Sequence, residues 1–261
     1  MAKGHIPVPD ELKAFLEVED CSDFDLKKYF ITQDNQMLFD TIVREKKLGD
    51  QLRERFHISY LNTMLMYGLP GTGKTTFARY VACVLNIDFA YINFAKMMGG
   101  YGDANRIISD IFRYMTQQEC VFLLDEIDCI ARKRSKEGSD TAITMAANTI
   151  TVMQELDYMK RNGSKAIILA ATNRADTLDD ALLSRFSVKH EMLPLDNITK
   201  EKYIMQFVKD TGIPFREDDV RQYCARNSRL EQRNMEADVI QGIAKWLEEG
   251  EKGYLTIQHI K

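Results

Sequence analysis

Residues 68–75, with the letters GLPGTGKT, restrict the possible folds of this chain more strongly than any other segment, because they match the phosphate-binding pattern G-x-x-x-x-G-K-[ST]. Residues 64–67 before them form a short apolar run that predicts a buried strand, and the apolar side chains of residues 75–85 recur at helical spacing. A glycine-rich turn can match by chance, but strand, loop and helix in this order are the context that the pattern requires. The sequence therefore predicts a phosphate-binding loop.

The residue types in this loop are those that bind the phosphates of a nucleoside triphosphate. Glycines let successive backbone N–H groups turn toward phosphate oxygens, and the N-terminus of the following helix adds partial positive charge. We expect Lys74 to reach the β- and γ-phosphates and the hydroxyl of Thr75 to bind Mg²⁺. The predicted cofactors are ATP and Mg²⁺. The loop residues predicted to bind ATP are Gly68, Leu69, Pro70, Gly71, Thr72, Gly73, Lys74, Thr75 and Thr76.

Further polar residues follow two other apolar runs. Asp125 and Glu126 come directly after residues 121–124, and a carboxylate at the end of a parallel strand lies where open α/β sheets bind ligands. We expect Asp125 to hold Mg²⁺ through water and Glu126 to polarise the attacking water. Two solvated carboxylates are the alternative, which the nearby phosphate-binding loop disfavours. Asn173 follows the apolar residues 166–171, from where an amide can reach the γ-phosphate and the water.

Strands and helices alternate from residue 61 to residue 194. Near-continuous apolar runs at residues 89–93, 121–124 and 166–171 are typical of strands buried on both faces of a parallel sheet. Helical patterns at residues 105–115 and 141–159 separate these runs, and a last strand is predicted at residues 188–193. The predicted fold class is α/β, with a sheet between two layers of helices in residues 61–194.

The two ends of the chain have a different pattern. Residues 195–261 contain three amphipathic helical stretches broken by turn residues, which predict a small helical lid. Residues 1–60 predict a helical lead-in. It includes a short helix starting at Pro9, a brief strand or turn at residues 26–30 and a longer helix over residues 36–56.

Composition narrows the class of protein. The chain of 261 residues is 45% hydrophobic and 28% charged, as in ordinary globular proteins with a packed core. Its formal net charge of −4 argues against a dedicated nucleic-acid surface, which usually has a basic excess. We find no apolar run of membrane-spanning length and no signal pattern, and so expect a cytoplasmic protein. Five scattered cysteines without C-x-x-C spacing make a disulfide or zinc framework improbable.

Three segments together resemble the AAA family of ATPases over about residues 60 to 245. They are the phosphate-binding loop, the letters LLDEID at residues 123–128 and the letters ATNRADTLDDALLSRF at residues 171–186. The resemblance implies a P-loop NTPase core with a helical lid, ATPase activity and a ring as the working form, most often a hexamer. It also implies that Asn173 is the sensor-1 residue and that Arg185 is an arginine finger reaching the nucleotide of the neighbouring subunit.

The chain departs from the family pattern at several positions. Ser184 stands where many members have a second finger arginine, so Arg185 would act alone. In the lid, Glu236 replaces a glycine of the family's Gly-Ala-Asp motif, and Ile240 stands where clamp loaders place a sensor-2 arginine. Arg229 and Arg233 are the alternative candidates for that role. An aromatic residue of the family's pore loop has moved one place, to Tyr101. Packing of Tyr101 on the core is the alternative to a pore role.

These residues favour a ring-forming ATPase that remodels, unfolds or disassembles a protein substrate. The expected partners are further copies of the chain and a protein client or adaptor. A nucleic-acid-associated loader or switch is the alternative, and the basic residues 132–134 could contact nucleic acid, although a solvated loop is the simpler interpretation. A scaffold with little turnover is disfavoured, because Lys74, Asp125, Glu126, Asn173 and Arg185 are all present. Of these, Lys74, Glu126, Asn173 and Arg185 are the predicted catalytic residues.

Overall fold

A computed structural model describes residues 6–20, 24–94, 97, 104–130, 140–228, 230–250, 253–256 and 260. The chain divides into two compact units. Unit 1 comprises Met1–Phe24, Gln33–Gly68 and Gly73–Met192, and unit 2 comprises Asp25–Thr32, Leu69–Thr72 and Leu193–Lys261. The domain boundaries predicted after residues 60 and 194 stay predictions, because short segments of each unit interrupt the other along the chain.

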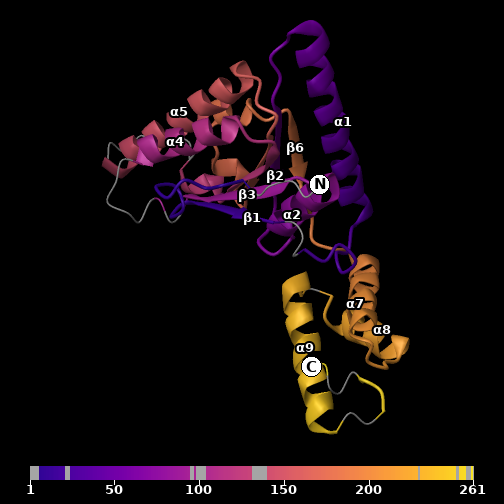
Figure 1. Ribbon diagram of the computed structural model, residues 1–261. Coiled ribbons are helices and arrows are strands. Elements are labelled where there is room, and N and C mark those ends of the chain that lie inside the picture. The colour runs from indigo at the N-terminus through magenta and orange to yellow at the C-terminus, as the bar shows by residue number, and fades with distance from the viewer. Residues whose placement is uncertain are drawn as a thin grey trace. The chain divides into compact units, whose positions relative to one another are not determined.

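Unit 1 is built on a six-stranded, mostly parallel sheet (Figure 1). Across the sheet the strands are β1 (Leu16–Glu19), β3 (Asp88–Asn93), β4 (Cys120–Asp125), β5 (Ile167–Thr172), β2 (Asn62–Tyr67) and β6 (Val188–Glu191). Every neighbouring pair is parallel except β1 with β3, which is antiparallel. The predicted α/β fold class is confirmed.

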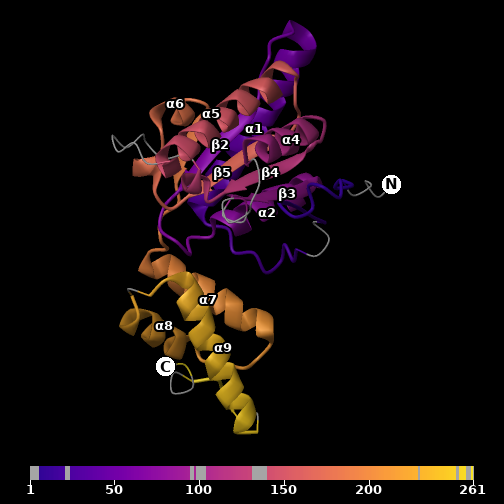
Figure 2. The same ribbon diagram turned by 90° about the vertical axis from the view of Figure 1, so that its left-hand side faces the viewer.

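Helices cover both faces of this sheet. They are α1 (Gln33–Phe56), α2 (Lys74–Leu85), α4 (Ala104–Thr116), α5 (Asp140–Arg161) and the short α6 (Asp180–Leu183), with 3-10 turns η2 (Ile127–Cys129) and η3 (Ala175–Thr177). In Figures 1 and 2, α4 and α5 lie on one face, and α1 and α2 lie on the other. Because both faces are covered, β5 is buried along its whole length, as is β4 as far as Leu124.

Unit 2 contains α7 (Asn197–Thr211), α8 (Glu217–Arg226) and α9 (Gln232–Glu248). The three helices share a core of their own, which includes Ile204 of α7, Val220 of α8 and Val239 of α9. The segment Asp25–Thr32 belongs to this unit, and the ring of Phe30 lies edge-on to the ring of Tyr203 at 5.5 Å between centroids. The three helices predicted in residues 195–261 are therefore present.

The N-terminal segment corrects one prediction. No helix begins at Pro9: residues 10–15 form turns and lead into β1. The strand forms because its alternating pattern places Leu16 in the core, where it is 1% exposed, while its backbone pairs with the edge of β3. The backbone N–H of Ile6 also donates to Asp88 Oδ2 at 2.9 Å. Residues 26–28 form a turn, one of the two predicted alternatives.

No helix in the described part of the chain is both long enough and apolar enough to span a membrane.

Candidate active site

The predicted site residues leave the sheet at the ends of three adjacent strands. Gly68 follows β2, Asn173 follows β5 and Asp125 ends β4, and these strands lie side by side in the order β4, β5, β2. Tyr67 and Thr172 are register partners at the last position of β2 and β5. Because parallel strands end at a common edge, the three segments start from one edge of the sheet, where α/β sheets bind ligands.

The phosphate-binding loop has the backbone that its glycines allow. Gly68, Gly71 and Gly73 have φ angles of 144°, 80° and 87°. A Cβ on Gly68 would lie 2.4 Å from the carbonyl oxygen of Met192, so no other residue fits there without a shift of the backbone. Gly73 is the N-cap of α2 and contributes no side-chain hydrogen bond. The first N–H groups of α2 therefore lack a side-chain cap, and an anion such as a phosphate can accept from them.

Lys74 is the first residue of α2 and is 8% exposed. Its Nζ donates to the carbonyl oxygen of Gly68 at 3.0 Å, so the side chain folds back along the loop. Burial lowers the pKa of this lysine, whereas the negative charges of Asp125 and Asp128 raise it. The two carboxylates thus favour the ammonium form that a phosphate would need.

Thr75 and Asp125 meet, as their predicted shared role requires. Thr75 Oγ1 donates to Asp125 Oδ2 at 3.0 Å, and Asp125 Oδ1 accepts from the backbone N–H of Glu126 at 2.9 Å. A hydroxyl and a carboxylate beside a phosphate-binding loop are the hard oxygen ligands that Mg²⁺ takes together with phosphates. The residues present therefore fit Mg²⁺·ATP, and the metal-binding roles of Thr75 and Asp125 stay predictions.

Glu126 adopts an unusual backbone conformation. Its φ of 50° and ψ of 41° lie in the left-handed region, and its side chain is exposed. The turn η2 begins directly after it, and the carbonyl oxygen of Glu126 accepts from Cys129 N at 2.8 Å. Non-glycine residues in this region carry strain and cluster at functional sites. The strain at Glu126 is thus consistent with its predicted role as the base.

Asn173 is exposed and directly follows β5, while its neighbour Thr172 is buried. Thr172 Oγ1 donates to Asp128 Oδ1 at 2.6 Å and accepts from the backbone N–H of Arg174 at 2.9 Å. No role for Thr172 or Asp128 was predicted from the sequence. The available signal was their polar character beside Asn173 and Glu126.

Arg185 makes its hydrogen bonds elsewhere in unit 1. Its guanidinium donates to the carbonyl oxygen of Ala181 at 2.8 Å, to Ser184 Oγ at 3.3 Å and to Asp157 Oδ2 on α5 at 3.2 Å. Its own carbonyl oxygen accepts from Thr63 Oγ1 at 2.7 Å. The backbone at Arg185 is therefore anchored to β2, while its guanidinium lies on α5 and α6 and makes no hydrogen bond to the residues of the strand ends.

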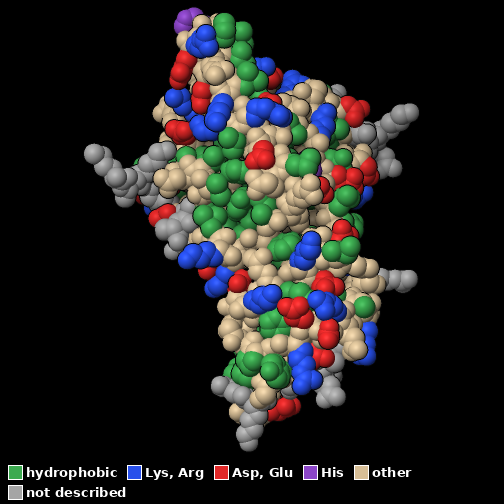
Figure 3. Space-filling model, turned by 90° about the vertical axis from the view of Figure 1, so that its right-hand side faces the viewer, with side chains coloured by type: hydrophobic (Ala, Val, Ile, Leu, Met, Phe, Trp, Pro, Cys, Tyr) green, Lys and Arg blue, Asp and Glu red, His purple; other side chains and the backbone are tan. Residues whose placement is uncertain are grey.

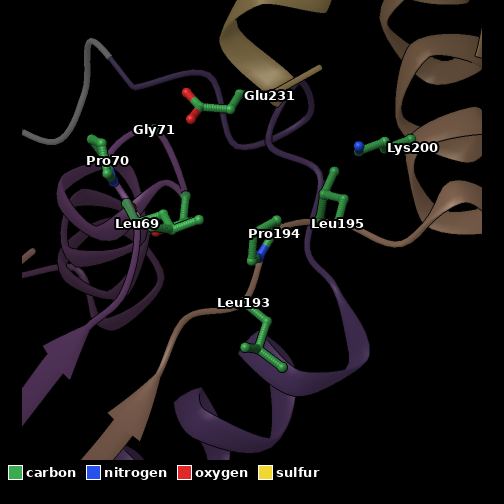
Figure 4. A pocket seen from close by; sticks show the side chains of 9 residues that line it. Leu69, Pro70, Gly71, Leu193, Pro194, Leu195, Lys200 and Glu231 are labelled. Atoms are coloured by element: carbon green, nitrogen blue, oxygen red, sulfur yellow. Dashed lines mark hydrogen bonds between the residues drawn. The ribbon is translucent and has the colours of Figure 1, made fainter. Parts of the chain in front are cut away.

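A small pocket lies within unit 2 (Figure 4). Leu69–Thr72, the tip of the phosphate-binding loop, line it together with Leu193, Pro194, Leu195, Lys200 and Glu231. Lys200 Nζ donates to the carbonyl oxygen of Ser228 at 2.6 Å, and a Cβ on Gly71 would lie 3.0 Å from Glu231 Oε2. The side chains of Leu193, Pro194 and Leu195 thus form an apolar wall of this pocket, next to the tip of the phosphate-binding loop.

The remaining predicted positions lie in the lid or outside the described residues. Tyr101, Arg229 and residues 132–134 lie outside the described residues. Arg233 is exposed near the start of α9 and stays one of the two candidates for a sensor-2 arginine. Glu236, at the family's glycine position, accepts a hydrogen bond from the hydroxyl of Tyr203, and burial raises the pKa of its carboxyl.

Comparison with known proteins finds a matching family and several relatives of this chain. The model of the ATPase family associated with various cellular activities (AAA) matches residues 64–193. The 26S proteasome subunit RPT4 of Saccharomyces cerevisiae is 34% identical over 170 residues, which are 62% of this chain and 38% of that protein. The ATP-dependent zinc metalloprotease FtsH of Parabacteroides distasonis is 41% identical over 145 residues, 52% of this chain and 21% of that protein. Spastin of Naegleria gruberi is 30% identical over 166 residues, 62% of this chain and 31% of that protein.

The chain thus covers less than half the length of these relatives. The match to the family model nevertheless includes the phosphate-binding loop, Asp125, Glu126, Asn173 and Arg185. The loop, Asp125, Glu126 and Asn173 lie at adjacent strand ends of a mostly parallel sheet, and the chain belongs to the AAA family of ATPases.

Proposed function

We propose that this protein hydrolyses ATP in a homo-oligomeric ring, as a hexamer, and uses the energy to remodel, unfold or disassemble a protein substrate in the cytoplasm. The observation that carries the hydrolytic part is the contact of Thr75 with Asp125 beside the uncapped N-terminus of α2. This contact brings two oxygens that suit Mg²⁺ next to a helix end that suits a phosphate.

Each residue has a defined part in the proposed reaction. The backbone N–H groups at the start of α2 and the ammonium of Lys74 bind and orient the phosphates. Thr75 and Asp125 would hold Mg²⁺, which when bound neutralises phosphate charge. The carboxylate of Glu126 orients a water molecule and accepts its proton, and the amide of Asn173 fixes the water and the γ-phosphate in line.

The position of Arg185 supports assembly of several copies. Its guanidinium contacts Asp157 and Ala181 instead of the strand ends that carry Lys74 and Glu126. We propose that Arg185 instead supplies its guanidinium to the nucleotide of the neighbouring subunit. Arginine fingers contribute a factor on the order of 10³–10⁵ in related phosphoryl transfer.

The protein substrate is proposed from the relatives and from charge. The matched relatives include a 26S proteasome subunit and an ATP-dependent protease. On the face drawn in Figure 3, Lys and Arg side chains are intermixed with Asp and Glu side chains. With a formal net charge of −4, nucleic acid is the weaker alternative.

ATP turnover with three variants tests the hydrolytic site. We expect Glu126→Gln to bind Mg²⁺·ATP as wild type does and to lose phosphate release, because the amide cannot accept the proton. Lys74→Ala should lose tight binding, and Thr116→Val, whose hydroxyl donates only to Phe112 O within α4, is the matched control. Hydrolysis by Glu126→Gln at the wild-type rate would exclude Glu126 as the base.

The substrate class needs a second experiment. Wild-type turnover is measured with an unfolded protein and, separately, with single-stranded DNA. Stimulation by the unfolded protein alone is expected, and stimulation by DNA alone would favour the loader or switch. Affinity capture with Glu126→Gln in ATP, compared with Lys74→Ala, then isolates the ring together with its client.

A further inference from the structure

One side-chain hydrogen bond connects the turn after Glu126 with the turn that carries Asn173. Asp128 lies in η2, which is closed by the bond from Cys129 N to Glu126 O at 2.8 Å. Thr172 is the last residue of β5 and immediately precedes Asn173. The bond from Thr172 Oγ1 to Asp128 Oδ1 measures 2.6 Å, the usual length for a charge-assisted bond from a hydroxyl to a carboxylate.

This bond begins where the sheet ladder stops. The register between β4 and β5 runs from Val121 with Ile167 to Leu124 with Ala170 and ends there. Asp125 and Glu126 on one side, and Asn173 on the other, lie beyond the last pair. The backbone ladder therefore does not fix the separation of the two turns, whereas the Asp128–Thr172 bond spans them directly.

Thr172 also shapes its own turn. It is 1% exposed, and its hydroxyl both donates to Asp128 and accepts from the backbone N–H of Arg174 at 2.9 Å. The accepted bond holds the backbone on the far side of Asn173, so both neighbours of Asn173 are tied to one buried hydroxyl. A hydroxyl with both roles filled has one preferred orientation, so the backbone on the two sides of Asn173 is held in place.

We propose that Asp128 and Thr172 are positioning residues for hydrolysis, which set the separation of the Glu126 carboxylate from the Asn173 amide on the two sides of the attacking water. In this role both act through the residues beside them, Asp128 on the turn that follows Glu126 and Thr172 on the turn that carries Asn173. The proposal rests on the hydrolytic site proposed above. A purely structural role, in which the bond only satisfies a buried hydroxyl, predicts a loss of stability without a selective loss of turnover.

Thr172→Val tests the proposal, because valine keeps the shape and removes the hydroxyl. We expect kcat to fall roughly 10- to 100-fold, the range that a misplacement of about 1 Å produces. The Kd for a fluorescent ADP analogue, measured with Mg²⁺ present, should stay at the wild-type value, since the substitution leaves the phosphate-binding loop unchanged. Thr172→Ser keeps the hydroxyl and should restore most of kcat, and Thr116→Val again controls for the loss of a threonine hydroxyl.

Two variants of Asp128 separate the effect of its hydrogen bond on kcat from the effect of its charge. Asp128→Asn keeps a carbonyl oxygen that can accept from Thr172, so its kcat should lie above that of Asp128→Ala. In an Asn173→Ala background, whose residual turnover is the reference, Thr172→Val should lower kcat much less than in the wild type, because the residue it positions is already gone.

Three results would overturn the proposal: unchanged kcat in Thr172→Val, a fall of kcat and nucleotide affinity together that Thr172→Ser does not restore, or full additivity with Asn173→Ala. Failure of the hydrolytic site itself is recognised separately, because wild-type turnover would then not depend on Glu126.

Discussion

The left-handed conformation of Glu126 implies that this residue lowers the stability of unit 1, and substitution by glycine tests that. Glu126 has a φ of 50°, whereas glycine adopts such an angle without steric conflict. Glu126→Ala is the matched partner, since it removes the same carboxylate and keeps a Cβ. Any difference between these two variants reports the backbone and not the lost charge.

The magnitude follows from two opposing effects. A Cβ in the left-handed region costs about 1–2 kcal/mol, and glycine loses about 0.5–1 kcal/mol more backbone entropy on folding. The bonds from Glu126 N to Asp125 Oδ1 at 2.9 Å and from Cys129 N to Glu126 O at 2.8 Å involve only backbone atoms of residue 126, so they hold its conformation in both variants. The midpoints of these two ranges differ by about 0.75 kcal/mol, so Glu126→Gly should be more stable than Glu126→Ala by about that amount.

Thermal unfolding in the absence of nucleotide is the assay. For a unit of this size the expected difference corresponds to roughly 1–4 °C in Tm, with Glu126→Gly above Glu126→Ala. Both variants should lack ATP turnover, so the gain in stability would accompany a loss of function. Equal Tm values, or a lower value for Glu126→Gly, would refute the reasoning and mean that the left-handed conformation costs residue 126 no more than the backbone entropy that glycine loses.

Other predictions concern separate parts of the site. Lys74→Ala should abolish tight ATP binding by isothermal titration, and wild-type affinity would remove Lys74 from the phosphate site. Arg185→Ala should bind ATP but turn over poorly, and mixing it with Lys74→Ala should restore part of the activity; no recovery in rings shown to be mixed would contradict action on a neighbour. Gly68→Ala should lower stability by at least about 2 kcal/mol in urea unfolding, since its Cβ would lie 2.4 Å from Met192 O, and a neutral result would contradict the close approach. Burial raises the pKa of Cys224 to about 11, so its thiol is protonated below that pH, and mass spectrometry should find it unalkylated at pH 8 until the chain unfolds.

Sequence patterns predicted the elements whose apolar runs are long or whose loop has a fixed context. The strands β4 and β5 are buried almost throughout, and their composition alone identifies them. The meeting of Thr75 with Asp125 also follows from sequence, because both were predicted to hold Mg²⁺ and because strand ends of a parallel sheet share an edge.

Other features depend on contacts between distant segments. The strand β1 has only four residues, and its formation depends on pairing with β3, more than 60 residues further along the chain. Likewise, Thr172 and Asp128 are ordinary polar residues in the sequence. Their bond exists because β4 and β5 are neighbours and because the ladder ends before either turn.

The contacts of Arg185 suggest how a single chain and an assembly differ. Its ion pair with Asp157 is partly open to solvent, with side-chain exposures of 31% for Arg185 and 47% for Asp157. Such a pair stabilises a fold by about 0–1 kcal/mol, so its loss would cost the subunit little. A phosphate group with several negative charges, presented by a neighbouring subunit, would attract the guanidinium more strongly than one solvated carboxylate does. The bond from Thr63 to the Arg185 carbonyl would meanwhile keep the backbone in place, so only the side chain would have to move. In the proposed ring, Asp157 then serves as a weak resting partner that the neighbour's nucleotide replaces.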